Sequence, residues 1–256
     1  MAQQTYRARV IVLQKTKLGE TDLILTLLAE DGSQIRAVAK GARRPSSPFS
    51  SRLELYSQAQ VLLAAGRSLD IVKEAQIIES NAELRHDMEH AAAAAPLAEL
   101  LNKVTQLGLV SPQVFLLTQV CLSAIGKASP TGALVITAAH LLKAVSFSGF
   151  RPSLSRCARC GNPIDYCVAD VKTAVSYTEG GVICKACAPS SDVVLLSTQT
   201  CNWARVFLHT TIDDIAAMQV APGAALAVLH FCQPWIKEHI GLNLKSLNFL
   251  FTCGLF

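Results

Sequence analysis

Two Cys-x-x-Cys pairs constrain the fold of this chain more than any other feature of its sequence. Their members are Cys157, Cys160, Cys184 and Cys187. Each pair brings two thiolates within reach of one tetrahedral metal ion, so the segment between the pairs has to fold back on itself. Gly180-Gly181 can turn a hairpin between strands at 173–177 and 182–183. The sequence therefore predicts a small module at residues 151–192, closed by one Zn²⁺ per chain.

Four sulfur ligands fill a tetrahedral shell and leave no position for a substrate, so the predicted zinc is structural and not catalytic. A redox-active dithiol and a site that has lost its metal stay open as alternatives. Cys167 lies between the pairs and could compete as a ligand, although its spacing from either pair is poorer. The remaining cysteines lie in apolar helical surroundings and are predicted to be buried core thiols. They are Cys121, Cys201, Cys232 and Cys253.

The composition raises the question of a membrane. Of the 256 residues, 51% are hydrophobic and 16% charged, which excludes a disordered or collagen-like chain. Two uncharged stretches, 104–126 and 215–236, approach the roughly 20 residues that a spanning helix needs. Each carries at least one proline and several polar side chains, so we interpret both as buried helical pieces and expect no membrane contact. The apolar run at 10–13 is too short for a signal peptide, and nine cysteines fit a reducing cytosol.

The first 80 residues have the pattern of short β-strands. Runs rich in Val, Ile, Leu and Thr are separated by turn residues, and Asp31-Gly32 between two apolar runs is a typical hairpin signal. The predicted strands are 6–14, 22–29, 34–39, 53–64 and 69–76. Five strands in about 75 residues suit a small closed barrel. Periodicity alone fits an OB-fold and an SH3-like barrel nearly equally.

After Ser80 the composition shifts to Ala and Leu, which favours helices. The first helix is expected to have a cap at Ser80 or Asn81. The predicted helices are 81–107, 112–127, 130–147, 197–209, 211–217 and 222–239. Alanine-rich helices pack closely, so these segments are expected to form one bundle that the cysteine module interrupts.

The predicted fold class is therefore α+β and multidomain. The predicted domains are a barrel at 1–80, the first part of a helical domain at 81–150, the zinc module at 151–192, and the second helical part at 193–256.

A basic segment runs from the third predicted strand into the loop that follows. Its basic residues are Arg36, Lys40, Arg43, Arg44 and Arg52, and no acidic residue lies between them. Such a loop on a small barrel can lay cations along a phosphate backbone. An ordinary solvated loop explains the charge equally well.

Aromatic residues are few in the predicted barrel. Only Tyr6, Phe49 and Tyr56 occur in the first 80 residues, which is a small number for a surface that stacks successive bases. Contacts with nucleic acid are therefore expected to favour phosphates. Binding of that kind is nearly independent of base sequence and strongly dependent on salt.

Motifs of common enzyme classes are absent from the sequence. It has no P-loop, no G-x-G-x-x-G, no H-E-x-x-H and no G-x-S-x-G, and no His-x-Glu accompanies the cysteines. Nothing nominates a catalytic site, so we expect no enzymatic activity. Two rival functions stay open, namely a zinc-containing protein–protein adaptor with incidental DNA affinity and a metal-dependent hydrolase with an unfamiliar helical pocket.

The order of these parts resembles RecO, a bacterial DNA repair and recombination mediator family. The segment Ala37-Val-Ala-Lys-Gly-Ala-Arg-Arg is similar to part of the family's amino-terminal region. Further similar segments are 17–32, 141–161, 180–188 and 238–247. These ordered segments span nearly the whole chain.

The resemblance implies an OB-fold at 1–80 and a non-enzymatic role. Members of the family bind single- and double-stranded DNA, anneal complementary strands coated by single-stranded DNA-binding protein, and act with RecR to help load RecA. Carried onto this chain, DNA contact falls on residues 40–44 and the neighbouring basic residues, and metal binding falls on the four paired cysteines. The helical domain would receive the C-terminal tail of the single-stranded DNA-binding protein. A cytoplasmic, nucleoid-associated bacterial protein is expected.

Overall fold

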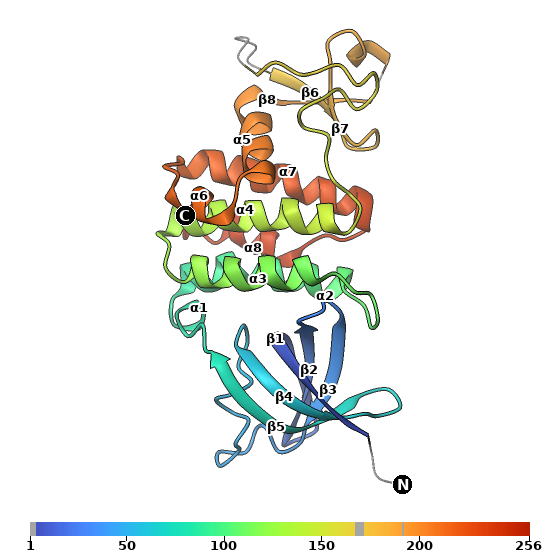
Figure 1. The fold of residues 1–256 in the computed structure, drawn as a ribbon. Coiled ribbons are helices and arrows are strands. Elements are labelled where there is room, and N and C mark those ends of the chain that lie inside the picture. The colour runs from blue at the N-terminus through green and yellow to red at the C-terminus, as the bar shows by residue number, and fades with distance from the viewer. Residues whose placement is uncertain (1–3, 167–171, 191) are drawn as a thin grey trace. The chain divides into compact units, whose positions relative to one another are not determined.

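The structure is a computed structural model that describes residues 4–166, 172–190 and 192–256 (Figure 1). Its backbone contacts divide the chain into two compact units, Met1–Lys127 and Ala128–Phe256. The domain boundaries predicted after residues 80, 150 and 192 stay predictions.

Five strands of the first unit form a closed barrel. They are β1 (Thr5–Leu18), β2 (Asp22–Ala29), β3 (Gln34–Ala39), β4 (Gln58–Ala64) and β5 (Asp70–Glu79). They close in the order β1-β2-β3-β5-β4, and every neighbouring pair is antiparallel except β3 and β5. This is the arrangement of a five-stranded OB-like barrel. The predicted α+β fold with an amino-terminal barrel of this kind is confirmed.

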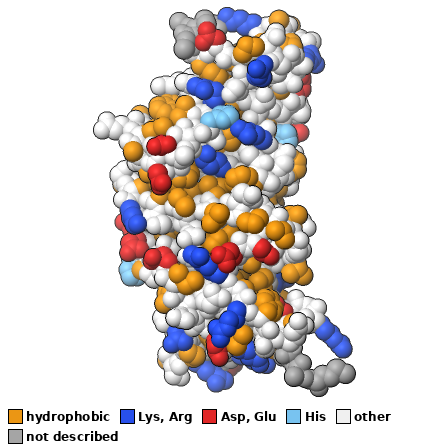
Figure 2. All heavy atoms as spheres, viewed as in Figure 1, with side chains coloured by type: hydrophobic (Ala, Val, Ile, Leu, Met, Phe, Trp, Pro, Cys, Tyr) orange, Lys and Arg blue, Asp and Glu red, His pale blue; other side chains and the backbone are white. Residues whose placement is uncertain are grey.

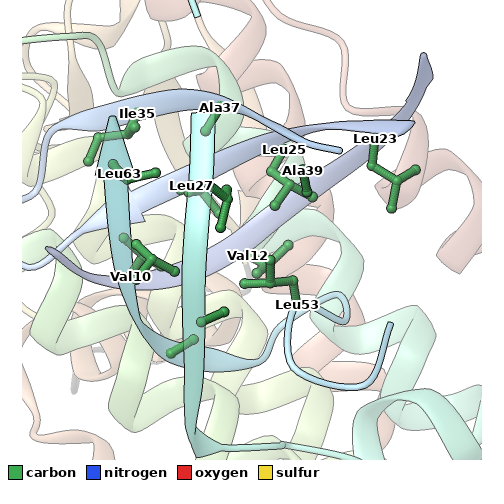
Figure 3. Packing of buried hydrophobic residues seen from close by; sticks show 14 of the residues in the cluster. Val10, Val12, Leu23, Leu25, Leu27, Ile35, Ala37, Ala39, Leu53 and Leu63 are labelled. Atoms are coloured by element: carbon green, nitrogen blue, oxygen red, sulfur yellow. The ribbon is translucent and has the colours of Figure 1, made fainter. Parts of the chain in front are cut away.

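Alternate residues of the strands build the barrel core. Val10 and Val12 of β1 are fully buried among the inward side chains of the neighbouring strands. Figure 3 shows these side chains converging, with Leu53 from the segment before β4 beside Val12. The core is almost entirely aliphatic, so apolar burial is the main force that stabilises the barrel.

A β-bulge in β1 changes which of its side chains face the barrel interior. The register between β1 and β2 shifts just after Val12. Beyond the shift, Lys15 lies opposite Leu25. Lys17 lies opposite Leu23. Directly opposite residues of an antiparallel pair share a face, and both leucines belong to the core. The bulge therefore brings two lysines to the inner face near one end of the barrel.

The fourth strand starts later than predicted, at Gln58 and not at residue 53. Residues 53–57 form a turn in which Tyr56 has a φ of 68°. This left-handed backbone cannot continue a strand. The apolar side chain of Leu53 that suggested a strand instead packs into the barrel core.

The helix predicted at 81–107 is interrupted near its start. The structure has α1 (Glu83–His86) and α2 (Met88–Val104), separated by Asp87 in an extended conformation. Asp87 caps α2, because its carboxylate accepts a hydrogen bond from the backbone N–H of His90 at 2.9 Å. The cap predicted at Ser80 or Asn81 is wrong, because the N-cap residue of α1 is Ala82, which makes no side-chain capping hydrogen bond. The side chain of Asn81 donates to the carbonyl of Tyr56 instead.

The loop between α2 and α3 (Pro112–Ile125) packs against the β2–β3 turn. The backbone N–H of Ser111 donates to the carbonyl of Asp31 at 2.8 Å, and that of Gln34 donates to Gln106 at 3.1 Å. Gly32 has a φ of 83°, and a Cβ there would overlap the carbonyl of Ser111. The turn can reach the loop because its residue 32 has no side chain.

Five α-helices lie in the described part of the second unit. They are α4 (Pro130–Phe147), α5 (Thr198–His209), α6 (Ile212–Ala217), α7 (Pro222–Ile240) and α8 (Lys245–Thr252). The last was not predicted from the sequence. Helix α4 is long and apolar enough for a membrane span, but 67% of it is buried within the fold, so its length and composition are weak evidence for a span.

A three-stranded sheet in the second unit lies between the two cysteine pairs in sequence, with its last strand after them. Its strands are β6 (Lys172–Ser176), β7 (Gly181–Ile183) and β8 (Val194–Ser197), in the order β7-β6-β8. The hairpin expected around Gly180-Gly181 is confirmed, since β6 pairs with β7 in antiparallel register. The third strand, β8, was not predicted because its four residues directly precede a helix.

Candidate nucleic-acid interface and metal centre

The four paired cysteines converge on one point of the second unit. The sulfur atoms of Cys157, Cys160, Cys184 and Cys187 all lie within 4.8 Å of one another. The Sγ atoms of Cys160 and Cys184 are 3.7 Å apart. Ligands of a tetrahedral zinc lie about 2.3 Å from the metal, which places two sulfurs about 3.8 Å apart. The group is therefore of the right size to hold a metal ion.

Tight turns position each cysteine pair. The backbone N–H of Gly161 donates to the carbonyl of Cys157 at 2.9 Å, and Gly161 has the left-handed φ of 75° that such a turn requires. At the second pair, the N–H groups of Cys187 and Ala188 both donate to the carbonyl of Cys184 at 3.0 Å. Each turn folds the backbone so that both thiols of a pair point the same way.

The electrostatics of the cluster favour a thiolate at Cys157. Burial of its thiol would raise the pKa, but hydrogen bonds from the backbone N–H groups of Cys184, Cys160 and Arg159 and from the Cys160 thiol outweigh it and lower the pKa to about 6. Hydrogen bonding with the Cys184 thiol, together with burial, raises the pKa of Cys187 to about 12. Without a metal, the thiolate at Cys157 is favoured and that at Cys187 is disfavoured. A divalent cation would remove this difference, because it stabilises all four thiolates together.

Other cysteines lie outside this cluster or outside the described residues. Cys167, considered as a competing ligand, lies outside the described residues. Cys121, Cys201 and Cys232 are buried core thiols, as predicted. The prediction for Cys253 is wrong, since this residue follows α8 and is only half-buried.

Two of the five predicted basic residues brace the loop after β3. The guanidinium of Arg43 donates to the carbonyl oxygens of Gly19 at 2.9 Å and Glu20 at 2.7 Å. That of Arg52 donates to the carbonyl of Ala75 in β5 at 3.2 Å. Arg43 therefore stabilises the contact of this loop with the β1–β2 turn, and Arg52 stabilises its contact with β5.

The other three basic residues are exposed and available to a ligand. Arg36 lies on the outward face of β3, and Lys40 and Arg44 lie in the turn that follows. In the part of the chain that the structure describes, no hydrogen bond or ion pair engages these three side-chain cations. Figure 2 shows Lys and Arg side chains over the barrel, as well as over the rest of the visible face. Exposed cations on a barrel of this kind can contact phosphates.

The family of the chain follows from comparison with known proteins. Two family models match it, "Recombination protein O N terminal" over residues 1–81 and "Recombination protein O C terminal" over residues 85–248. The chain belongs to the RecO family. The barrel is thus the amino-terminal RecO region, and the cysteine cluster lies within the carboxy-terminal one.

Curated RecO relatives are similar over nearly the whole chain. A protein named "DNA repair protein RecO" from Desulfitobacterium hafniense (strain DSM 10664 / DCB-2) is 34% identical over 245 residues, which are 94% of this chain and 87% of the relative. A protein of the same name from Cutibacterium acnes (strain DSM 16379 / KPA171202) is 30% identical over 254 residues, 96% of this chain and 98% of the relative.

Sequence reasoning missed two lysines and one carboxylate of this RecO barrel. Lys15 and Lys17 reach its inner face only through the bulge in β1. Their spacing of two residues placed them on one face of a strand, but the sequence did not indicate which face. Asp22, at the start of β2, accepts a hydrogen bond from the backbone N–H of Gly41 and so shapes the basic turn.

Proposed function

We propose that this RecO-family chain is a DNA repair and recombination mediator whose barrel binds DNA through phosphate contacts. The observation that carries the proposal is the set of exposed cations at Arg36, Lys40 and Arg44 on an OB-like barrel in the region similar to RecO. Among the described residues, no hydrogen bond or ion pair engages their side chains, although the carboxylate of Asp22 lies near Lys40 and Arg44. Cations that are not engaged in this way are available to replace the counterions of a phosphate backbone.

The proposed activity is annealing of complementary single strands. Two strands repel each other through their phosphates, and bound cations reduce that repulsion. The protein would act by neutralisation and by holding strands together, so annealing needs no ATP and no catalytic group. This non-enzymatic role also agrees with the lack of enzyme motifs in the sequence.

Protein partners complete the proposal. By resemblance to the family, the helical region would receive the C-terminal tail of single-stranded DNA-binding protein, and the chain would act with RecR to help load RecA onto coated strands. Both single- and double-stranded DNA are proposed ligands. Several weak contacts on one assembly give a high effective concentration, which suits a chain with a net charge of only +4. The proposed location is the bacterial cytoplasm at the nucleoid.

We further propose that the cysteine cluster holds one structural Zn²⁺ per chain. The 3.7 Å separation between the sulfurs of Cys160 and Cys184 fits a tetrahedral zinc shell. Four thiolate ligands leave the metal no open position. When bound, zinc would supply folding free energy to the module, and this chain's own residues would make the DNA contacts.

An annealing assay tests the proposal. Complementary fluorescent oligonucleotides, bare and coated with single-stranded DNA-binding protein, are mixed with the wild-type protein or with an Arg36→Gln/Lys40→Gln/Arg44→Gln variant. We expect the wild type to accelerate annealing without ATP and the variant to lose most of this effect while keeping its circular dichroism spectrum. Failure of the folded wild type to bind or anneal DNA would favour the adaptor function instead.

A further inference from the structure

A hollow opens at the end of the barrel where the β1 bulge places its lysines. Its volume is about 450 Å³. Leu23 and Leu25 of β2 and Leu53 of the loop between β3 and β4 line it, and all three are buried core residues. The hollow therefore offers an apolar floor that continues the barrel core.

The wall of the hollow contains an aromatic side chain. Phe49 lines it and is only half-buried, and it packs against the core cluster. The next residue in the chain, Ser50, also lines the hollow. A partly exposed aromatic side chain beside an apolar floor is suited to a flat aromatic ligand.

The rim of the hollow is positively charged. Lys15, Lys17 and Arg43 contribute three cations, and Glu54 contributes one carboxylate. Lys15 is paired with Glu54, with 2.7 Å between Nζ and Oε2, and Arg43 is held by backbone carbonyls. Lys17 is exposed, and no described hydrogen bond or ion pair engages its ammonium group. A ligand that enters here should therefore carry both an aromatic ring and a negative charge.

We propose that this hollow receives one unpaired nucleobase of a bound single strand, with the base ring against Phe49 and a neighbouring phosphate at Lys17. The proposal rests on the proposed DNA binding and extends it from phosphates to a base. A nucleotide combines the two properties that the site requires, and the volume lies within the range of about 300–1,000 Å³ typical of small-ligand pockets.

Strand preference follows from this geometry. A base in a duplex is stacked and paired, and it reaches such a pocket only after costly unstacking and unpairing. An unpaired base avoids the cost of breaking a pair. The hollow thus makes the barrel favour single strands over duplexes of the same charge, and it does so without reading base sequence, because every base has a ring face.

The test compares two oligonucleotides that share a backbone. A fluorescent single-stranded oligo-dC is titrated against an oligomer of the same length in which every nucleotide is abasic. Stacking on one aromatic side chain should make the protein bind oligo-dC about 5- to 150-fold more tightly than the abasic strand. Both titrations use the full chain at one fixed salt concentration.

Variants test whether the difference in affinity between oligo-dC and the abasic strand comes from the hollow. Phe49→Leu keeps an apolar side chain against the core but removes the ring, so it should reduce the preference for oligo-dC by at least several-fold. Phe249→Leu, which changes an exposed aromatic residue of α8, is the matched control and should leave the preference unchanged. Lys17→Gln should weaken binding of both strands. Circular dichroism confirms that each variant is folded.

Two results would overturn the proposal: equal affinity of the wild type for oligo-dC and the abasic strand, or an unchanged preference in folded Phe49→Leu. In either case, salt-dependent binding of the abasic strand would leave the phosphate-based function intact. Absence of binding to both strands would instead contradict the proposed function itself.

Discussion

The carboxylate of Asp22 accepts a hydrogen bond from the backbone N–H of Gly41, with 2.7 Å between Oδ1 and N. This bond joins the start of β2 to the turn after β3, where Lys40 and Arg44 lie. The hydrogen bond from Gly41, more than any other contact, lowers the pKa of Asp22, and the nearby cations Lys40 and Arg44 lower it further. The carboxylate of Asp22 thus holds the turn after β3 in place, and this turn contains two of the proposed phosphate contacts, Lys40 and Arg44.

Arg43 and Arg44 are adjacent in sequence but differ in role, which gives a matched pair of variants. Arg43→Gln loses hydrogen bonds to the carbonyls of Gly19 and Glu20, so the free energy of unfolding should fall by about 1 kcal/mol. Arg44→Gln loses no described side-chain hydrogen bond and should keep its stability. For single-stranded DNA, its plot of log K against log salt should become less steep by about 0.7.

Urea unfolding and salt titrations of both variants check this division. Equal stability of the two variants would contradict the bracing role of Arg43. An unchanged salt slope in Arg44→Gln would remove this residue from the phosphate contacts.

Alanine substitutions at Gly32 and Gly108 distinguish the cost of steric overlap from the cost of backbone strain. Both have positive φ, 83° and 75°, but only at Gly32 would a Cβ overlap another part of the chain, the carbonyl of Ser111. Gly108→Ala should cost about 1–2 kcal/mol from the left-handed backbone alone. Gly32→Ala should cost clearly more, because the β2–β3 turn would have to move away from the α2–α3 loop. Equal Tm values of the two variants would contradict the described packing.

Local signals made parts of the fold predictable. The bounds of β2, β3 and α4 agree with those predicted, since each lies next to a clear turn or cap. Ser129 accepts a hydrogen bond from the N–H of Gly132, and Pro130 occupies the first turn of α4. The convergence of the four paired cysteines was equally predictable, because the Cys-x-x-Cys spacing is itself local.

Features that depend on distant partners were not predictable. The helix break at Asp87 and the bulge after Val12 are defined by contacts that a single-sequence periodicity does not contain. The sequence identified the basic segment, but it did not show which of its cations brace the loop and which are exposed. Arg43 reaches a turn more than 20 residues earlier, and Arg52 reaches a strand that follows in the chain.

The cysteine cluster predicts a metal dependence of stability. Cys157→Ser or Cys184→Ser should reduce the zinc content from one per chain and lower the Tm, because a structural metal contributes directly to folding. Cys253→Ser, outside the cluster, is the matched control and should retain the metal. Metal analysis by mass spectrometry measures the content. Stoichiometric zinc in both cluster variants would contradict the assignment.

Burial of the His140 side chain predicts that the protein loses stability in mild acid. Burial of this residue in α4 lowers the pKa of its imidazole to about 3, whereas the same imidazole in the unfolded chain has a pKa of about 6.5. The unfolded state therefore binds a proton first, and the stability that His140 contributes above pH 6.5 is lost as the pH falls toward 3. The loss approaches about 1.4 kcal/mol per pH unit.

Urea unfolding at pH 7.5 and pH 5.5 measures the effect of His140. The wild type should lose about 1.4 kcal/mol more than His140→Leu between these values. An equal pH dependence in the two proteins would show that His140 is not the group responsible.

The central claim is that exposed cations of the barrel bind the phosphates of DNA, and its most direct test is equilibrium binding of a fluorescent single strand at several salt concentrations. Lys17, Arg36, Lys40 and Arg44 should give the wild type a slope of log K against log salt of about −2.8, at about 0.7 per contact. The Arg36→Gln/Lys40→Gln/Arg44→Gln variant should retain a slope of about −0.7. A variant with the wild-type slope, or a wild type that does not bind at low salt, would contradict the account.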